Sequence, residues 1–441
     1  MSSAIAQSVR LPPGPKWPVY AQGIAFLVAR RRVMESLAKR YGTEFTMTLP
    51  FRPMVVLSDP ALVKELFQTS TTLVQGVEPN LDVVFGPGST FGLHGEDHRR
   101  RRKLLVPSFH GNRMRANEGV VEEEALKEIA SWPEGEEFPV LESMMRITLN
   151  SILRAVFGAE GTELDTLREL MPRLMKRASV MAILPQLRHD WGPRSPWGRY
   201  MTSRREFDGV IRSLVEDIKK DPNFEERVDV LSLLVQSTYE DGTPMSLTEM
   251  ADEMFTLLAA GHETTATSLA WAVERLRRHP DILSRLTDEI DAGGSDLLQA
   301  TINEVQRCRP VIDACARQVI EEPVTIGEWV IPKDNIIRVD IGLIHQNEAV
   351  YPEAHRFNPD RFLHDKPDLY AWVPFGGGNR RCIGAAFANM EMNGVLTTML
   401  REVRLEPTAA PAEKWRNRGV AAAPNRGGRA VIRRRNKNAA K

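Results

Sequence analysis

The stretch FGGGNRRCIG, residues 375–384, decides how this chain is interpreted. An apolar helical stretch, 385–400, follows it, so we expect Cys382 at or beside a helix N-terminus. The open N–H groups and the dipole of a helix start favour a thiolate, the form of cysteine that ligates metal. Its glycines permit tight turns and close approach of a flat group, while Phe375 can cover the sulfur and Arg380 can neutralise a carboxylate. The stretch therefore predicts a metal-ligating cysteine.

Two other interpretations of this stretch are weaker. Consecutive glycines also occur in phosphate-binding loops, but no Lys-Ser/Thr pair follows these and the spacing is not that of a dinucleotide-binding turn. The glycines at 86, 88 and 92 do not match a phosphate-binding loop either, for the same reason. A merely buried thiol at Cys382 is disfavoured once the whole ten-residue pattern is counted.

A long helix is predicted between a capping box, Ser246-x-x-Glu249, and a stop at His279-Pro280. The proline-free range Leu247–Arg278 would be roughly 48 Å long and must cross a whole domain. Its centre reads AAGHETT, residues 259–265, where small residues let a large group approach. Threonines there can bond back to carbonyls a turn earlier and open the helix. A buried carboxylate and hydroxyl there are costly unless partnered or functional. Alone, the stretch also fits a helix-packing groove with its glutamate at a solvent edge.

The composition is that of an ordinary globular protein. Of 441 residues, 42% are hydrophobic and 26% charged, which suffices for a large core. Lys plus Arg (58) equals Asp plus Glu (58), which argues against a nucleic-acid partner. Three cysteines make no disulfide framework, and Cys308 and Cys315 are most simply core residues. The N-terminus lacks the features of a signal peptide, so we expect a cytoplasmic location.

The N-terminal region contains one apolar run, Val19–Ala29, about half as long as a membrane-spanning helix. We therefore expect no membrane anchor. The range Val19–Arg32 is expected to form a docked amphipathic helix, with an interfacial role as the less favoured alternative.

Periodicity along the chain predicts a mainly α fold with a minor β region, in one domain over 10–435 with flexible termini at 1–9 and 436–441. The predicted helices, besides the long one, are Asp59–Phe67, Asn117–Ser131, Glu142–Phe157, Glu163–Met175 and Ser203–Lys219. The predicted β segments are Thr46–Thr48, Met54–Leu57, Pro323–Val330, Ile336–Ile341 and Arg429–Arg433.

Four motifs, in order along the chain, resemble those of the cytochrome P450 superfamily, soluble bacterial type. The cysteine stretch is similar to its haem-ligand motif, and AGHETT, residues 260–265, to its oxygen-activation motif. EVQR, residues 304–307, matches its Glu-x-x-Arg helix, and FNPDRF, residues 357–362, the segment whose arginine completes that pair. The resemblance covers roughly residues 10–435. It implies a triangular, α-rich fold with haem between the long central helix and the cysteine-loop helix.

The resemblance also assigns site residues. Cys382 is expected as axial thiolate ligand of haem b, and Glu304, Arg307 and Arg361 as a buried triad bracing the cysteine loop, with Arg356 as alternative third member. His98, Arg102, Arg317 and Arg380 are expected on the haem propionates. The other expected haem contacts are Ala260, Thr264, Phe375 and Gly384.

The implied reaction inserts one oxygen atom of O2 into a hydrophobic substrate of fatty-acyl, terpenoid or steroid-like type. Glu263 would relay protons and Thr264 would hydrogen-bond the reacting oxygen. No fused flavin or iron–sulfur domain is evident, so electrons would come from a separate ferredoxin (or flavodoxin) and its reductase. The basic residues Arg99, Arg100, Arg101 and Lys103, with Arg381, form either a solvated face or a basic proximal docking patch for that partner.

The substrate pocket is expected by position in the family. The candidates are Phe85, Phe91, Leu258, Val311 and Asp313. Asp313 either recognises a substrate hydroxyl or amine or caps a turn. His262 either lines a water channel or is packed in the core, the latter being favoured.

Two rival functions remain. A peroxide-driven oxygenase or rearrangement enzyme on the same fold typically alters the acid–threonine pair, which this sequence retains. A non-catalytic haem sensor or ligand-binding protein would need neither a proton relay nor a docking surface for a redox protein.

Overall fold

The computed structural model describes residues 8–50, 52–77, 81–109, 117–158, 161–364, 366–418 and 421–435, so most of the predicted flexible termini lie outside the described residues. The chain divides into two compact units. Unit 1 comprises Met1–Glu78, Gln306–Asn358 and His364–Cys382. Unit 2 comprises Pro79–Val305, Pro359–Leu363 and Ile383–Lys441. The expectation of a single domain stays a prediction.

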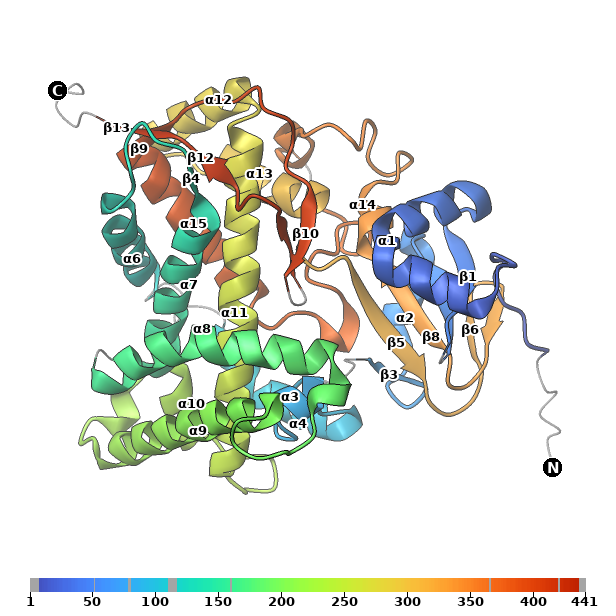
Figure 1. Cartoon of the computed structure of the whole chain (residues 1–441), viewed down its shortest axis with the longest axis horizontal. Helices are drawn as coiled ribbons and strands as arrows, with labels where there is room; N and C mark the ends of the chain where they lie inside the picture. Colours follow the sequence, from blue (N-terminus) through green and yellow to red (C-terminus); the bar gives the residue numbers. More distant parts are fainter. Residues whose placement is uncertain are drawn as a thin grey trace. The chain divides into compact units, whose positions relative to one another are not determined.

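Unit 2 is built around helix α11 (Leu247–Leu276), which runs through the middle of its helices in Figure 1. The predicted capping box of Ser246 and Glu249 is present, and the helix ends two residues before the predicted Arg278. Helix α7 (Val140–Phe157) packs along α11, and α15 (Ala385–Glu402) contacts both α11 and α6 (Glu118–Ala130). The long helix is therefore surrounded by protein.

Unit 2 also contains α3 (Leu81–Phe85), α4 (Gly95–Leu105), α8 (Thr162–Ile183), α9 (Pro196–Lys220), α10 (Val230–Gln236), α12 (Pro280–Asp291) and most of α13 (Asp296–Cys308). Of these, α3, α4, α8, α9 and α10 share one large apolar core with α7 and α11. Helices α8 and α9 pack on one another, and Phe207 of α9 contacts Phe255 of α11. The described residues of unit 2 also form three two-stranded sheets. Strand β4 (Phe138–Pro139) pairs with β12 (Arg429–Ala430), and β9 (Val403–Leu405) pairs with β13 (Ile432–Arg434). Strand β10 (Trp415–Arg418) pairs with β11 (Ala421–Pro424).

Unit 1 holds a five-stranded sheet of order β1-β2-β8-β5-β3. Its strands are β1 (Glu44–Thr48), β2 (Pro53–Leu57), β8 (Ile336–Asp340), β5 (Ala314–Val319) and β3 (Val74–Gly76). Only the β2–β8 pairing in this sheet is parallel. The unit also contains the hairpin β6 (Val324–Ile326)–β7 (Trp329–Ile331) and helices α1 (Val19–Tyr41), α2 (Pro60–Gln68) and α14 (Ile341–His345).

The mainly α fold with a minor β region is confirmed. All the predicted helices and β segments occur, and the ranges at 323–330 and 429–433 are each divided between two strands. Most ends agree within two residues, but α8 continues eight residues beyond the predicted Met175, α9 begins seven residues before the predicted Ser203, and α1 continues nine residues beyond the predicted Arg32. Strands β3, β4, β5, β9, β10 and β11 were missed. Within the described residues, no helix is long and apolar enough to cross a membrane.

Candidate functional site

The cysteine stretch forms a tight loop in unit 1 that ends at the start of α15. The backbone N–H of Cys382 donates a hydrogen bond to the carbonyl oxygen of Phe375 at 3.0 Å, which closes the loop. Gly384 is the N-cap residue of α15, so Cys382 lies two residues before the cap, as predicted. Cys382 is exposed. A cysteine so placed is favoured as a thiolate and open to a ligand.

The glycines of this loop are required by its contact with α2. A Cβ on Gly377 would lie 2.2 Å from the ring of Phe67. Gly378 has φ +64°, and a Cβ there would lie 2.8 Å from the carbonyl oxygen of Phe67. These two positions therefore exclude any side chain, and the loop is held against α2.

Arg317, one of the predicted propionate contacts, helps to hold this loop. Its side chain is buried, Nη2 donates to the carbonyl oxygen of Gly377 at 2.8 Å, and its guanidinium lies 5.4 Å from the ring centroid of Phe67. Arg380 passes close to the backbone of β3, because a Cβ on Gly76 would lie 2.7 Å from its Nε. A propionate contact for either arginine stays a prediction.

His345, which the sequence did not single out, connects α13 to the residues just before the loop. Its Nε2 accepts a hydrogen bond from the backbone N–H of Val373 at 3.0 Å. Its Nδ1 lies 3.1 Å from the carbonyl oxygen of Arg307, whose Nη1 donates in return to the carbonyl oxygen of His345 at 2.6 Å. Burial, assisted by the charge of Arg307, lowers the pKa of His345 to about 3, so the ring is neutral with its proton on Nδ1.

Two of the predicted triad residues, Glu304 and Arg307, are buried, and the structure favours Arg361 over Arg356 as partner of Glu304. Nε of Arg361 lies 3.3 Å from Oε2 of Glu304, which is fully buried. Arg356 is exposed and pairs with Glu353. Arg307 is only 1% exposed.

The predicted oxygen-activation segment lies at the centre of α11 in unit 2. Ala260 is exposed and Gly261, Glu263 and Thr264 are partly exposed, although most of the surrounding helix is buried. The Thr264 hydroxyl donates to the carbonyl oxygen of Ala260 at 2.7 Å, and the helix continues through this bond. The predicted back-bonding of threonine is confirmed, but it does not interrupt the helix.

Glu263 has an ion-pair partner that sequence reasoning missed. Nε of Arg418, on β10, lies 3.1 Å from Oε1 of Glu263. The Glu263 side chain is 13% exposed and that of Arg418 is 54% exposed. Burial raises the pKa of Glu263, and the charge of Arg418 opposes the rise. The pair thus places an exposed cation beside the largely buried carboxylate at the centre of α11.

His262 is packed, in agreement with the favoured expectation. Its ring is buried, and Nδ1 lies 2.9 Å from the carbonyl oxygen of Leu258. Its own carbonyl oxygen accepts a hydrogen bond from the hydroxyl of Thr148 on α7 at 3.0 Å. Burial lowers the pKa of His262, so the ring is neutral.

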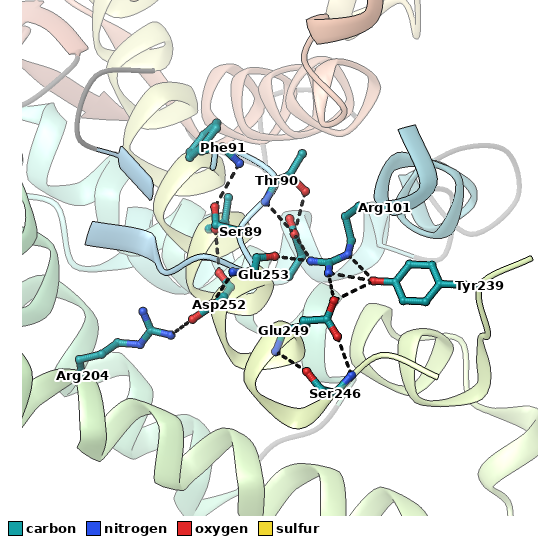
Figure 2. A network of polar contacts seen from close by, with 12 residues as sticks. Ser89, Thr90, Phe91, Arg101, Arg204, Tyr239, Ser246, Glu249, Asp252 and Glu253 are labelled. Atoms are coloured by element: carbon teal, nitrogen blue, oxygen red, sulfur yellow. Dashed lines mark hydrogen bonds and ion pairs between the residues drawn. The ribbon is translucent and has the colours of Figure 1, made fainter. Parts of the chain in front are cut away.

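The basic run at 99–103 requires a correction, because Arg101 is buried rather than part of a surface patch. Its Nη2 lies 2.6 Å from Glu249 and its Nη1 lies 3.1 Å from Glu253, both on α11. Nε and Nη2 also donate to the hydroxyl of Tyr239 at 3.0 and 2.8 Å (Figure 2). Arg101 thus joins α4 to the long helix.

The other members of the basic run are paired with acidic side chains. Arg99 lies 2.8 Å from Glu96 and Arg100 lies 2.5 Å from Asp241. Lys103 contacts Glu240. These ion pairs partly neutralise the run and favour the solvated face over the docking patch, the two alternatives that the sequence left open.

The segment between α3 and α4 is fastened to α11 by carboxylates (Figure 2). Asp252 accepts a hydrogen bond from the N–H of Gly88 at 2.8 Å and contacts Arg204. Glu253 accepts from the N–H and hydroxyl of Thr90 at 3.0 and 2.7 Å. Burial raises the pKa of Glu253, opposed by Thr90 and Arg101. Two predicted pocket residues belong to this part of the chain, because Phe85 directly precedes the segment and Phe91 lies within it. The backbone around both residues is thus tightly held.

The predicted pocket residues fall into two groups. Phe85, Phe91 and Leu258 belong to the apolar cluster of unit 2, where the two phenylalanine rings lie 5.5 Å apart. Val311 and Asp313 lie in unit 1. Asp313 is 2.9 Å from Arg30 and 3.4 Å from Arg338, and its carbonyl oxygen accepts the N–H of Ile341. These contacts give Asp313 a structural role in ion pairs with two arginines, which differs from the turn cap that the sequence also offered.

The donor set fits the haem expected from the sequence. The cysteine sulfur lies just before a helix start, and a Cβ on the nearby Gly384 would have no neighbour within 4 Å, so a flat group can approach the backbone there. His98 and Arg102 lie on α4, four residues apart and hence on one face. Arginine and histidine donors of this kind suit carboxylates such as haem propionates.

Comparison with known proteins agrees with these features. The family model for cytochrome P450 matches residues 12–427. Cytochrome P450 138 of Mycobacterium tuberculosis (strain H37Rv) is 52% identical over 428 residues, which cover 97% of each chain. Cytochrome P450 135B1 of the same strain is 36% identical over 439 residues, covering 97% of this chain and 92% of that one.

Solved structures share the fold at lower identity. Retinoic acid bound cyanobacterial CYP120A1 gives a TM-score of 0.83 at 22% identity and covers 97% of this chain and 100% of its own. The cytochrome P450DA heme domain gives a TM-score of 0.82 at 23% identity and covers 97% of this chain and 98% of its own. Sequence and fold agree, and this chain therefore belongs to the cytochrome P450 family and is a haem monooxygenase with cysteine-thiolate ligation.

Proposed function

We propose that Cys382 ligates the iron of haem b and that the enzyme inserts one oxygen atom of O2 into a hydrophobic organic substrate. The observation that carries this proposal is the exposed cysteine at the start of α15, in a loop held by Arg317 and Phe67. When bound, thiolate-ligated haem supplies the oxygen-activating chemistry, because the thiolate donates electron density that favours O–O cleavage. The protein supplies binding, orientation and control of protons.

His98, Arg102, Arg317 and Arg380 are proposed to bind the haem propionates. Arginine is suited to this task because its forked donors stay charged and match a carboxylate. His98 is buried on α4 beside Arg101, whose ion pairs fix that helix on α11. Ala260, Phe375 and Gly384 are proposed as further contacts with the cofactor.

Glu263 and Thr264 are proposed to deliver protons. The Glu263 carboxyl can take a proton from solvent where it meets the exposed Arg418 and release it toward the centre of α11. The Thr264 hydroxyl now donates to Ala260, and rotation about its Cα–Cβ bond would free it to pass that proton on. Arg418 is a positioning residue in this scheme, because it holds the carboxyl but does not touch substrate.

The substrate is proposed to be of fatty-acyl, terpenoid or steroid-like type. The wall offered by unit 2 is apolar and aromatic, with Phe85, Phe91 and Leu258 in one cluster. The charge of Asp313 is balanced by two arginines, which argues against recognition of a substrate amine at that position. A largely apolar molecule suits this lining.

A separate redox protein, a ferredoxin or flavodoxin with its reductase, is proposed as electron donor. Arg99, Arg100 and Lys103 are paired with acidic side chains and Arg101 is buried, so these residues give little support to a basic docking face. The exposed Arg381 of the cysteine loop is the remaining candidate contact from that set.

The deciding experiment is the spectrum of the reduced carbonyl complex of the purified protein. We expect a thiolate-type spectrum in wild type and in the control variants Cys308→Ser and Cys315→Ser, and its loss in Cys382→Ser. A thiolate spectrum that survives in Cys382→Ser contradicts the assignment. Compounds that shift the haem spin state then identify the substrate class. Turnover with peroxide but not with any reductase system would favour the peroxide-driven alternative. If neither peroxide nor a reductase system supports turnover, a haem sensor is favoured.

A further inference from the structure

The first half of α1 carries apolar side chains on its outer surface. Tyr20, Ile24, Leu27 and Val28 are 76%, 63%, 81% and 83% exposed. Their spacing places them on one face of a helix, and Trp17, 44% exposed, lies two residues before its start. Single exposed apolar residues are ordinary on protein surfaces, but a continuous row of them marks a surface that contacts something else.

The inner face of the same segment is polar and small, so the helix cannot turn its apolar face inward. Gln22 is 2% exposed. Its Nε2 donates to the carbonyl oxygen of Trp17 at 2.9 Å, and its Oε1 accepts from the N–H of Thr48 at 2.9 Å. Gly23 lies against Pro50, since a Cβ there would be 2.9 Å from the proline ring. The orientation of α1 is thus fixed by its contacts, with the apolar row outward.

Positive charge follows the apolar row directly. The helix deviates from regular geometry at Ala29 (φ −137°, ψ 34°), and Arg30, Arg31 and Arg32 come next. Arg30 pairs with Asp313 and Arg31 with Glu35, while Arg32 is exposed. From residue 1 to residue 34 the sequence contains no Asp or Glu. The segment therefore combines an outward apolar face with cations and lacks acidic residues of its own.

We propose that this face of α1 binds the surface of an anionic lipid bilayer. Tyr20, Ile24, Leu27 and Val28 would enter the boundary between headgroups and acyl chains, and Arg31 and Arg32 would meet lipid phosphates. A bilayer fits better than a second copy of the chain, because a two-fold contact through this face would bring like charges together. The inner face of α1 is thus docked through Gln22 and Gly23, in line with the docked helix expected from the sequence. The interfacial role, which the sequence left as an alternative, is proposed for the outer face.

The test is flotation of the full-length, haem-loaded protein with lipid vesicles. We expect binding to vesicles of phosphatidylcholine with phosphatidylglycerol, weaker binding to phosphatidylcholine alone, and release by salt. The double variant Leu27→Ser/Val28→Ser should bind about tenfold more weakly. The double variant Arg31→Gln/Arg32→Gln should lose the preference for anionic lipid. Val228→Ser, at a position 59% exposed in unit 2, is the matched control and should bind as wild type.

Folding of each variant is checked by haem content and the reduced carbonyl spectrum, so that lost binding is not mistaken for unfolding. Equal vesicle binding by wild type and Leu27→Ser/Val28→Ser overturns the proposal, as does a failure of wild type to bind any vesicle. A dimer in solution that this double variant abolishes, without lipid binding, would assign the face to a second copy and would also overturn it.

Discussion

Nε of Arg361 lies 3.3 Å from Oε2 of Glu304, and this contact fastens the segment after Asn358 to α13. The Glu304 side chain is fully buried and that of Arg361 is 13% exposed, so the pair is largely shielded from water. Arg356 lies five residues earlier, but it is 63% exposed and pairs with Glu353 on the surface. The same residue type at nearly the same place therefore occupies two very different environments.

Replacing Arg361 by Gln should destabilise the protein by about 3–5 kcal/mol, because the buried carboxylate of Glu304 loses its cation. Arg356→Gln should change the free energy of unfolding by about 1 kcal/mol or less, since it removes only an exposed pair. Denaturant unfolding of both variants, with the ratio of haem to protein after purification, measures the difference. Equal destabilisation of the two variants would show that Arg361 does not brace the fold.

Arg101→Met should also cost about 3–5 kcal/mol, because Glu253 would remain buried without its guanidinium partner. The neighbouring Arg100→Gln is the matched control, since its pair with Asp241 is largely exposed, and we expect about 1 kcal/mol or less. Thermal or urea unfolding provides the measurement. A small effect in Arg101→Met would mean that Tyr239, Glu249 and Glu253 reorganise without it.

Much of the fold could be predicted because its signals are local. The capping box at Ser246 and Glu249 lies within one helical turn, and the start of α11 follows from it. The cysteine loop and the start of α15 were likewise predicted from adjacent residues. The short strands β3 and β10 were missed because three or four residues show too little alternation, and their pairing depends on partners far along the chain.

The parts of the site that the sequence did not predict depend on long-range contacts. Arg101 was assigned to a surface because it lies in a run of charges, and only the folded chain shows that this one member meets Glu253, 152 positions away. Arg418 gave no signal as the partner of Glu263, because 155 positions separate them. His345 acts through backbone atoms of Arg307 and Val373, which no side-chain pattern encodes.

Glu391 of α15 should make stability depend on pH. Its carboxyl is fully buried, and burial holds its pKa well above the usual value against the opposing effect of Thr265 and Ser151. The native state then keeps a proton that the unfolded chain releases above about pH 4.5, so stability is full at low pH and falls as pH rises. Glu391→Gln removes this dependence, and its stability relative to wild type should rise with pH, by at most about 1.4 kcal/mol per pH unit.

Urea unfolding of wild type, Glu391→Gln and the exposed control Glu122→Gln between about pH 5 and pH 8 checks this expectation. The control should follow wild type at every pH. If the stability difference between Glu391→Gln and wild type is the same throughout, Glu391 is ionised in the native protein and the assignment is wrong.

The pair of Glu263 and Arg418 predicts a shift in the pH dependence of catalysis. Arg418 opposes the rise in the pKa of Glu263 that burial causes, so Arg418→Gln should raise this pKa further and keep the carboxyl protonated to higher pH. The limb of the pH profile for coupled product formation that belongs to Glu263 should move to higher pH in Arg418→Gln and vanish in Glu263→Gln. Arg416→Gln, an exposed position on the same strand, should leave the profile unchanged. An identical profile in wild type and Arg418→Gln would mean that the ion pair has no part in proton delivery and is a structural contact.

Thr264→Ala should uncouple electron use from product formation and release peroxide. It should not move the limb of the pH profile that belongs to Glu263, because the hydroxyl acts after the carboxyl in the proposed relay.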